Sequence, residues 1–332
     1  MVALYVTSLE KGSGKTAICA GIYKHLLDDG KKVGFFKPVI TSGKNPKQDI
    51  DNDAAFMKHT FALEEPADSL CPVISGEGSL PGRIKEAFAR VSPGKDVVIV
   101  EGIYQRSVVE ALDARVIIVE GYSKELSGAK LINSYQDLGK YLVGVVLNKV
   151  PGKQVEQVRS EISTRFGKDR IDILGVLPED RALLTLTIGE LAEHIQGEIL
   201  SYNNESIELA ENFMLGALCV DPGPQYFGRK ANKVVIVRGE RPDMQMAALE
   251  TSTRCLVLSG NTAPIPAVRQ RAEDKKVPII LARDDTPAIV ASIEDALGKT
   301  RFNQDRKLPK LIEIMEQHFN FKAVYRALGL AG

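Results

Sequence analysis

The sequence predicts an α/β protein with a doubly wound, mostly parallel sheet, followed by a second, smaller α/β domain. The first observation is a series of short apolar runs, at residues 4–6, 33–36, 97–100, 116–119 and 142–147. Each run is apolar throughout rather than alternating, which is typical of strands that are covered on both faces. The second observation is that segments of helical length separate most of these runs. Together they favour a parallel sheet between two layers of helices.

Helices are expected in the segments between and after these strands, at residues 15–28, 52–61, 80–91, 124–138 and 153–166. The last one is followed by Gly167, and glycine is a frequent residue just beyond the end of a helix. We expect this first domain to occupy residues 1–190.

A change in composition between about residues 180 and 205 marks the expected end of the first domain. The second domain is expected over residues 205–300, with strands at 234–237, 255–258 and 279–282. Residues 301–332 form a charged tail whose apolar positions suit an amphipathic helix. Such a helix would pack on the body of the protein or on a partner.

Composition restricts the classes of partner. Lys plus Arg and Asp plus Glu each number 43, so the net charge favours neither nucleic acid nor an anionic membrane surface. No basic region precedes the first apolar run, and no stretch of about 18 apolar residues occurs, so we expect a cytoplasmic protein. The histidines stand at unrelated spacings and are expected to be structural or surface residues, so no metal beyond magnesium is implied: His25, His59, His194 and His318.

A glycine-rich loop joins the first expected strand to the first expected helix. It ends in Gly14, Lys15 and Thr16, and its position is the one that a phosphate-binding P-loop requires. Glycines allow backbone N–H groups to approach a phosphate, the lysine neutralises phosphoryl oxygens, and the threonine hydroxyl ligates Mg²⁺. The strict pattern has a glycine where Leu9 stands, so this is a variant loop. We expect the following residues to bind ATP: Gly12, Ser13, Gly14, Lys15, Thr16 and Ala17.

Two acidic residues are candidates for the magnesium site. Glu101 ends an apolar run and precedes a glycine, at the edge of the sheet where ligands gather in this class of fold. Asp53 lies at the start of an expected helix, where an aspartate can equally be a simple cap.

At this point the sequence resembles dethiobiotin synthetase and its relatives, the P-loop group that includes the cobyrinic acid a,c-diamide synthases. The resemblance covers about residues 1–180 and rests on several motifs in order: residues 36–39 (FKPV), the helix of Asp53, residues 100–102 (VEG), Asn148 at the end of VVLN, and residues 175–178 (GVLP). It implies that Thr16, Asp53 and Glu101 hold Mg²⁺, and that Lys15 and Lys37 are the catalytic residues serving the phosphates and a reacting carbamate. It also implies that Asn148 contacts adenine and that the segment ending at Pro178 flanks the base.

The sequence departs from the synthetase on the substrate side. Where the synthetase has small residues after its Glu-Gly pair, this chain has Ile103, Tyr104 and Gln105. These bulky side chains favour a function other than dethiobiotin synthesis.

Residues 205–300 resemble the DRTGG domain through residues 213–217 (FMLGA), 237–243 (VRGERPD) and 281–286 (LARDDT). A synthetase-like domain followed by this one is also the N-terminal arrangement of long phosphate acetyltransferases. The resemblance implies a domain that senses a small metabolite. Arg241 and Asp243 follow an expected strand and are candidate ligand contacts, although a structural ion pair is an equal alternative.

These observations favour a protein that binds ATP and Mg²⁺, senses a small metabolite through its DRTGG domain, and hydrolyses ATP slowly. One alternative is an ATP-dependent enzyme that activates a carboxylate or carbamate. Another is a regulatory partner of a separate phosphate acetyltransferase, since we do not expect acetyl transfer by this chain alone. A homodimer is also an open alternative, because related P-loop proteins build sites across a two-fold axis.

Overall fold

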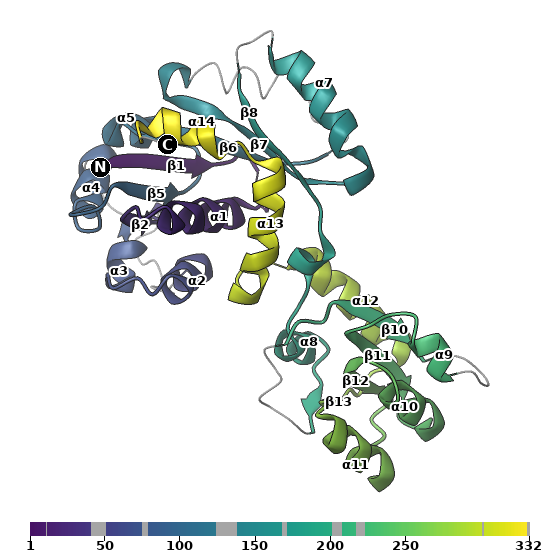
Figure 1. The fold of residues 1–332 in the computed structure, drawn as a ribbon. Coiled ribbons are helices and arrows are strands. Elements are labelled where there is room, and N and C mark those ends of the chain that lie inside the picture. The colour runs from purple at the N-terminus through teal and green to yellow at the C-terminus, as the bar shows by residue number, and fades with distance from the viewer. Residues whose placement is uncertain are drawn as a thin grey trace. The chain divides into compact units, whose positions relative to one another are not determined.

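The computed structural model divides the chain into two compact units (Figure 1). Unit 1 consists of Met1–Leu183 and Arg301–Gly332, and unit 2 consists of Leu184–Thr300. The structure describes residues 1–10, 12–40, 51–74, 79–123, 138–167, 171–200, 208–216, 223–300 and 302–330. Within these ranges no helix is both long enough and apolar enough to cross a membrane.

Unit 1 is built on a six-stranded parallel sheet with the order β2-β5-β1-β6-β7-β8. The strands are β1 (Val2–Thr7), β2 (Val33–Phe36), β5 (Val97–Glu101), β6 (Arg115–Gly121), β7 (Leu142–Val150) and β8 (Ile173–Pro178). Their central residues are buried on both faces, as the uninterrupted apolar runs predicted. The predicted fold class is confirmed.

The helices that follow these strands are α1 (Lys15–Asp28), α2 (Asn52–Thr60), α3 (Ala67–Leu70), α4 (Leu80–Phe88), α5 (Arg106–Leu112) and α7 (Val155–Gly167). A small parallel pair, β3 (Val39–Ile40) and β4 (Val73–Ile74), lies outside the main sheet. Short 3₁₀ turns occur at Gly139–Tyr141, Gly152–Gln154, Arg181–Leu184 and Asp305–Lys307. The helix predicted over residues 124–138 falls on residues 124–137, which lie outside the described part of the chain.

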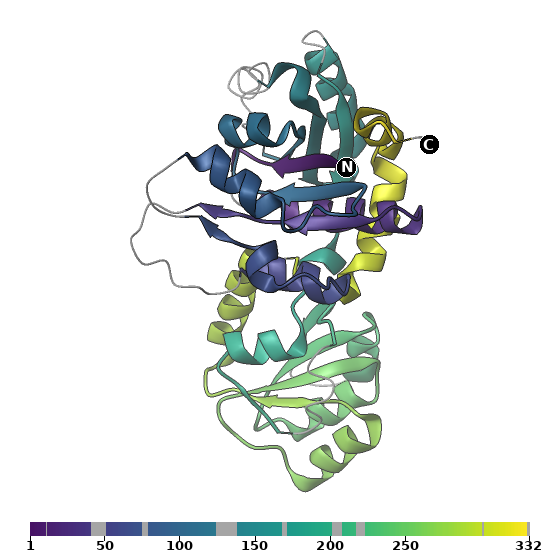
Figure 2. The same cartoon turned by 90° about the vertical axis from the view of Figure 1, so that its left-hand side faces the viewer.

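The C-terminal residues form two helices of unit 1, α13 (Leu308–His318) and α14 (Phe321–Leu328), drawn in yellow in Figure 1 and Figure 2. Helix α13 packs against α1. At Gly21 of α1, an added Cβ would lie 2.1 Å from the sulfur of Met315. A side chain at position 21 would therefore displace the tip of the Met315 side chain, and the buried face of α13 closes the apolar core of unit 1.

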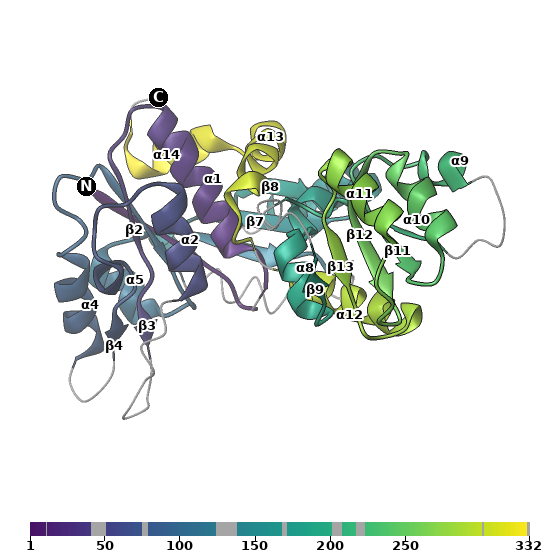
Figure 3. The ribbon, with the colours of Figure 1, turned by 90° about the horizontal axis from the view of Figure 1, so that it is seen from below.

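Unit 2 contains a five-stranded sheet with the order β10-β11-β12-β13-β9. Four strands are parallel and the last is antiparallel: β10 (Asn212–Leu215), β11 (Lys233–Arg238), β12 (Thr253–Ser259), β13 (Ile279–Leu281) and β9 (Glu198–Ile199). The helices are α8 (Ile188–His194), α9 (Gly223–Phe227), α10 (Pro242–Leu249), α11 (Pro266–Lys275) and α12 (Thr286–Lys299) (Figure 3). Separate apolar clusters, one containing α8 and α12 and the other α9, α10 and α11, show that this sheet is also covered on both faces.

Candidate functional site

The candidate site lies at the carboxyl ends of three neighbouring strands of unit 1. Strand β5 pairs with β1 on one side and with β2 on the other. The loop after β1, Lys37 after β2 and Glu101 at the end of β5 therefore meet at one edge of the sheet. In open α/β sheets this edge is where ligands bind.

The loop between β1 and α1 holds a backbone conformation that needs glycine. Gly12 and Gly14 have φ angles of +77° and +95°. A Cβ at Gly14 would also lie 2.2 Å from the Asn148 side-chain nitrogen. Helix α1 starts from Gly14 with no side-chain cap. No side chain of the described residues accepts from its first-turn N–H groups, and this is the arrangement that binds phosphate at a helix N-terminus.

Two residues of β7 hold this loop from the side. Asn148 donates from Nδ2 to the Ser13 carbonyl oxygen at 2.9 Å and accepts from the Lys149 N–H. The Lys149 ammonium donates to the Gly12 carbonyl oxygen at 2.9 Å. Because both contacts are to backbone oxygens, they orient the loop without occupying any of its N–H groups.

Lys15 has a neutral partner. Its Nζ donates to the Ser8 hydroxyl at 2.8 Å, and that hydroxyl donates to the Glu10 carbonyl oxygen at 2.6 Å. No carboxylate among the described residues forms an ion pair with Lys15. The positive charge beside the helix N-terminus is thus available to an anion.

Lys37 lies among three carboxylates. Its Nζ is 2.8 Å from Asp51 Oδ1 and 3.4 Å from Glu101 Oε1, and it also donates to Asp53. Thr16 Oγ1 donates to the same Glu101 oxygen at 2.9 Å. The sequence-predicted residues Thr16, Lys37, Asp53 and Glu101 are therefore brought together.

Glu101 is 2% exposed, and its second carboxylate oxygen is buried with no hydrogen-bond partner among the described residues. Burial raises the pKa of Glu101, and the Lys37 ammonium opposes this shift. For Lys37, burial would lower the pKa, but Glu101 and Asp53 outweigh it and hold the pKa above its usual value. A buried carboxylate oxygen without a partner is costly, so the site has an unused ligand for a cation.

These residues fit a magnesium ion. Three carboxylates face a single ammonium group, which leaves an excess of negative charge when all are ionised. Within the described ranges, no group of three His, Cys, Asp or Glu side chains is arranged to hold a metal by itself. Mg²⁺ commonly takes only one or two protein carboxylates and completes its shell with water and phosphate oxygens. A hydroxyl from Thr16 and oxygens from Asp53 and Glu101 match that donor set.

Two further predicted residues lie on the next strands of the sheet. Asn148 is near the end of β7, and Pro178 is the last residue of β8, where it pairs with Val150. Both are at the carboxyl edge. The Asn148 side chain already binds the loop through its nitrogen, and its oxygen accepts from the Lys149 N–H of the same strand.

Sequence reasoning missed three residues of this site. Ser8 binds Lys15, Asp51 binds Lys37, and Glu120 accepts a hydrogen bond from the Leu9 N–H at 3.0 Å. Glu120 lies near the end of β6, so the strand-end rule that identified Glu101 could have found it as well. Burial raises the pKa of Glu120 too.

The bulky residues after Glu101 do not all point the same way. Ile103 is 68% exposed, whereas Tyr104 packs against the apolar core. The Tyr5 hydroxyl donates to the Ile103 carbonyl oxygen and would clash with a side chain at Gly102. The backbone after Glu101 is therefore held by Tyr5, and the apolar side chain of Ile103 is exposed next to the candidate site.

Comparison with known proteins agrees with this architecture. Residues 2–76 match the family model of the AAA domain, and residues 190–296 match that of the DRTGG domain. The chain joins a P-loop domain to a DRTGG domain. The combination predicted from the sequence motifs is therefore confirmed.

Several relatives share one or both parts. A phosphate acetyltransferase from Synechocystis sp. is 21% identical over 355 residues, which cover 96% of this chain and 50% of that protein. An ATP-dependent dethiobiotin synthetase from Caldicellulosiruptor saccharolyticus is 29% identical over 116 residues, or 31% of this chain and 48% of the synthetase. The chain spans about half the length of these curated acetyltransferases.

Among solved structures, the chain is similar to the CBS and DRTGG domains of the regulatory region of Clostridium perfringens pyrophosphatase, complexed with the activator diadenosine tetraphosphate. The match has a TM-score of 0.30 and 12% identity, and it covers 41% of this chain and 56% of the other.

In the DRTGG domain, Arg241 and Asp243 bind each other. The Arg241 guanidinium donates to both Asp243 oxygens, at 2.9 and 2.7 Å. The hydrogen bond from Arg241 lowers the pKa of Asp243. The two residues therefore form a local ion pair at the start of α10, which is one of the two alternatives that the sequence left open for them.

Proposed function

We propose that the P-loop domain binds ATP together with Mg²⁺. The observation that carries this proposal is the convergence of the uncapped start of α1, the available Lys15 ammonium and the unpartnered Glu101 oxygen. The first two provide a phosphate site, and the third lies where a metal ion bound to those phosphates would need a ligand.

Each predicted residue has a role in this proposal. The backbone from Gly12 to Ala17 and the Lys15 ammonium would bind the phosphates. Thr16, Asp53 and Glu101 would hold Mg²⁺, which would neutralise phosphate charge. Asn148 would shape the loop and face the base together with Pro178. Lys37 already holds Asp53 and Glu101 in place, and its ammonium would serve the terminal phosphate.

We further propose that this nucleotide site is regulatory, with slow turnover, and that the DRTGG domain senses a second metabolite. The exposed apolar side chain of Ile103 beside the site and the similarity of almost the whole chain to half of a phosphate acetyltransferase support this reading. On this basis the chain, or the protein that contains it, adjusts an acetyltransferase activity to the nucleotide level.

An ATP-dependent carboxylate- or carbamate-activating enzyme is the second candidate. It is favoured by Lys15 and Lys37, whose charges both act on Glu101, because lysines next to a metal site stabilise charge on a transferring phosphoryl group. The two candidates differ in phosphate release and not in binding.

The test is calorimetric titration of ATP with Mg²⁺, with released phosphate measured in the same samples. Lys15→Ala should weaken binding about 10- to 100-fold, because it removes a charge-assisted contact of roughly 1.5–3 kcal/mol. Lys24→Ala, an exposed lysine on the same helix, is the matched control and should bind as the wild type does. Binding without phosphate release supports the regulatory reading, and rapid release supports the enzyme. If wild type and Lys15→Ala bind equally, the proposed site is wrong.

A further inference from the structure

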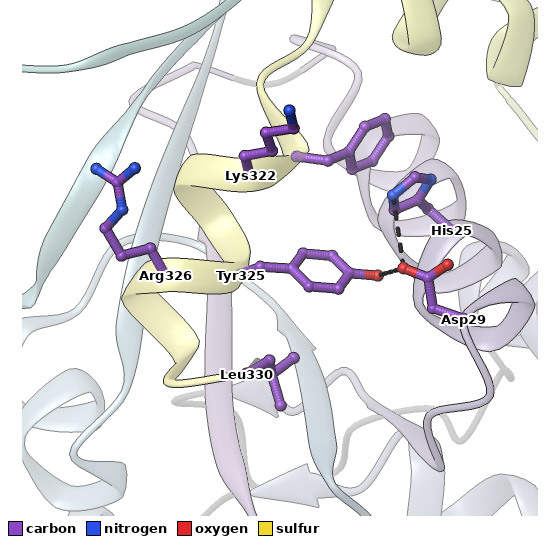
Figure 4. Close-up of a pocket in the computed structure, with 7 residues that line it drawn as sticks. His25, Asp29, Lys322, Tyr325, Arg326 and Leu330 are labelled. Atoms are coloured by element: carbon purple, nitrogen blue, oxygen red, sulfur yellow. Dashed lines mark hydrogen bonds and ion pairs between the residues drawn. The ribbon is translucent and has the colours of Figure 1, made fainter. Parts of the chain in front are cut away.

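A concave site lies at the end of α1 that is farther from the P-loop. A pocket of about 600 Å³ opens between the end of α1 and α14, and its lining includes His25, Asp29, Phe321, Tyr325 and Leu330 (Figure 4). This volume is within the range of small-molecule sites. Helix α1 starts at the phosphate loop and rises 1.5 Å per residue, so the pocket is roughly 20 Å from the nucleotide site.

Three aromatic rings form one wall of the pocket. The His25 ring stacks on Phe321 with centroids 3.7 Å apart and planes 14° apart. Tyr325 meets the same His25 ring edge-on at 5.7 Å. A planar ring is the ligand shape that such a surface binds best, because stacked and edge-on contacts add to the burial of apolar area.

The wall is held in position by Asp29. The Tyr325 hydroxyl donates to Asp29 Oδ2, and His25 Nε2 lies 3.9 Å from the same oxygen (Figure 4). These contacts tie α14 to the end of α1. The rings are therefore oriented before any ligand arrives, which lowers the entropy lost on binding.

Two cationic residues also line this pocket. Lys322 and Arg326 are one turn apart on α14, so they share a face of that helix, and both are exposed. Neither forms an ion pair with a carboxylate of the described residues. The single acid of the lining, Asp29, is already bound to Tyr325. The lining thus combines apolar rings with uncompensated positive charge.

We propose that this pocket binds a planar aromatic anion, with the ring against His25, Phe321 and Tyr325 and the anionic group at Lys322 and Arg326. The anionic group is a phosphate, sulfonate or carboxylate. The site is independent of the P-loop, so it holds whether or not the proposed nucleotide function is correct.

The experiment compares 1-naphthyl phosphate with uncharged 1-naphthol by calorimetric titration of the full chain carrying Lys15→Ala, which removes the P-loop lysine. We expect one naphthyl phosphate per chain, bound at least tenfold more tightly than naphthol. Lys322→Gln combined with Arg326→Gln should abolish this preference. Lys85→Gln combined with Arg90→Gln, two exposed cations at and just after α4, is the matched control and should keep it.

Three results would overturn the proposal. The first is equal affinity for the charged and uncharged probes. The second is loss of naphthyl phosphate binding when Lys15→Ala is compared with the wild type, which would place the probe in the P-loop. The third is an equal loss of affinity in the α4 control, which would mean that only the overall charge matters. Because all four substituted cations of these two pairs are exposed, the variants should fold.

Discussion

At Glu101, burial and the charge of neighbouring residues act against each other. Its carboxyl is almost fully buried, and burial raises its pKa, while Lys37 and the Thr16 hydroxyl stabilise the ionised form. Only the ionised form can ligate Mg²⁺. The protonation of this one group should therefore control the metal dependence of the site.

Acidification should weaken the effect of Mg²⁺ on nucleotide binding. We predict that this decline begins at a higher pH than it would for an ordinary glutamate, whose pKa is about 4.3. In Glu101→Gln the effect of Mg²⁺ should be smaller, because one metal ligand is removed, and the part of the pH dependence that comes from Glu101 should be lost, because the amide does not titrate. Titrations of ATP with and without Mg²⁺ between about pH 5 and pH 8 measure this. The exposed Glu86→Gln is the control, and an unchanged metal dependence in Glu101→Gln would refute the assignment.

The same substitution has a consequence for stability. A carboxyl whose pKa is higher in the folded than in the unfolded state binds more protons when folded, so the free energy of unfolding falls as pH rises through that interval. Glu101→Gln should remove this part of the pH dependence. Denaturant unfolding at several pH values would detect the change.

Some site residues could be predicted because they follow or end a parallel strand, where ligands bind in this class of fold. Lys15 and Thr16 follow β1 and Glu101 ends β5, and the structure brings them together with Lys37 and Asp53. Asp51 was hidden because its side chain also caps α2, accepting from the Asp53 N–H at 2.9 Å. The role of Ser8 could not be predicted, because a serine in a loop has no distinctive pattern and its contact with Lys15 is known only from the structure.

At the scale of elements, the contact between α1 and α13 depends on one small and one large residue. Gly21 leaves room for Met315, which is fully buried. The two helices are nearly 300 residues apart in the chain, so their packing is a long-range contact of unit 1.

We predict that Met315→Glu lowers the free energy of unfolding of unit 1 by about 2–5 kcal/mol, because it removes buried apolar atoms and buries a charge. Gln317→Glu adds the same charge at an exposed position of α13 and should change stability by less than about 0.5 kcal/mol. Chemical denaturation of both variants is the measurement. Equal effects would show that charge alone, and not the loss of packing, is responsible.

Elements with strong apolar runs were predictable and weaker ones were not. The helix predicted at 15–28 coincides with α1, and the run at 33–36 coincides with β2. Strand β8 was missed because Gly175 and Pro178 interrupt its pattern, and β10 because it is short and only partly buried at the edge of its sheet. Helix α5 was also missed, because no capping side chain marks its first turn in the sequence.

At the scale of the whole molecule, the chain leaves unit 1 at Leu183 and returns to it at Arg301. The change of composition between residues 180 and 205 led us to expect the end of the first domain in this region. The return was not visible, because an amphipathic helix shows that it has an apolar face but not which surface covers it.

We predict that residues 184–300, produced alone, fold and unfold in one cooperative transition, because the two apolar clusters of unit 2 are complete within this range. Thermal unfolding followed by circular dichroism, together with limited proteolysis, measures this. A fragment without a transition, or one digested as rapidly as an unfolded chain, would contradict it. The wild-type chain provides the reference transition.

The return of the chain to unit 1 also has a consequence during synthesis on the ribosome. Residues 302–330 emerge after unit 2, which takes on the order of 10 s to translate at roughly 5–20 residues per second. Until then the face of α1 that α13 covers stays open to solvent, while unit 2 already has all of its own residues. The later domain in the sequence can therefore finish folding first, and the nascent P-loop domain would be the one that chaperones need to protect.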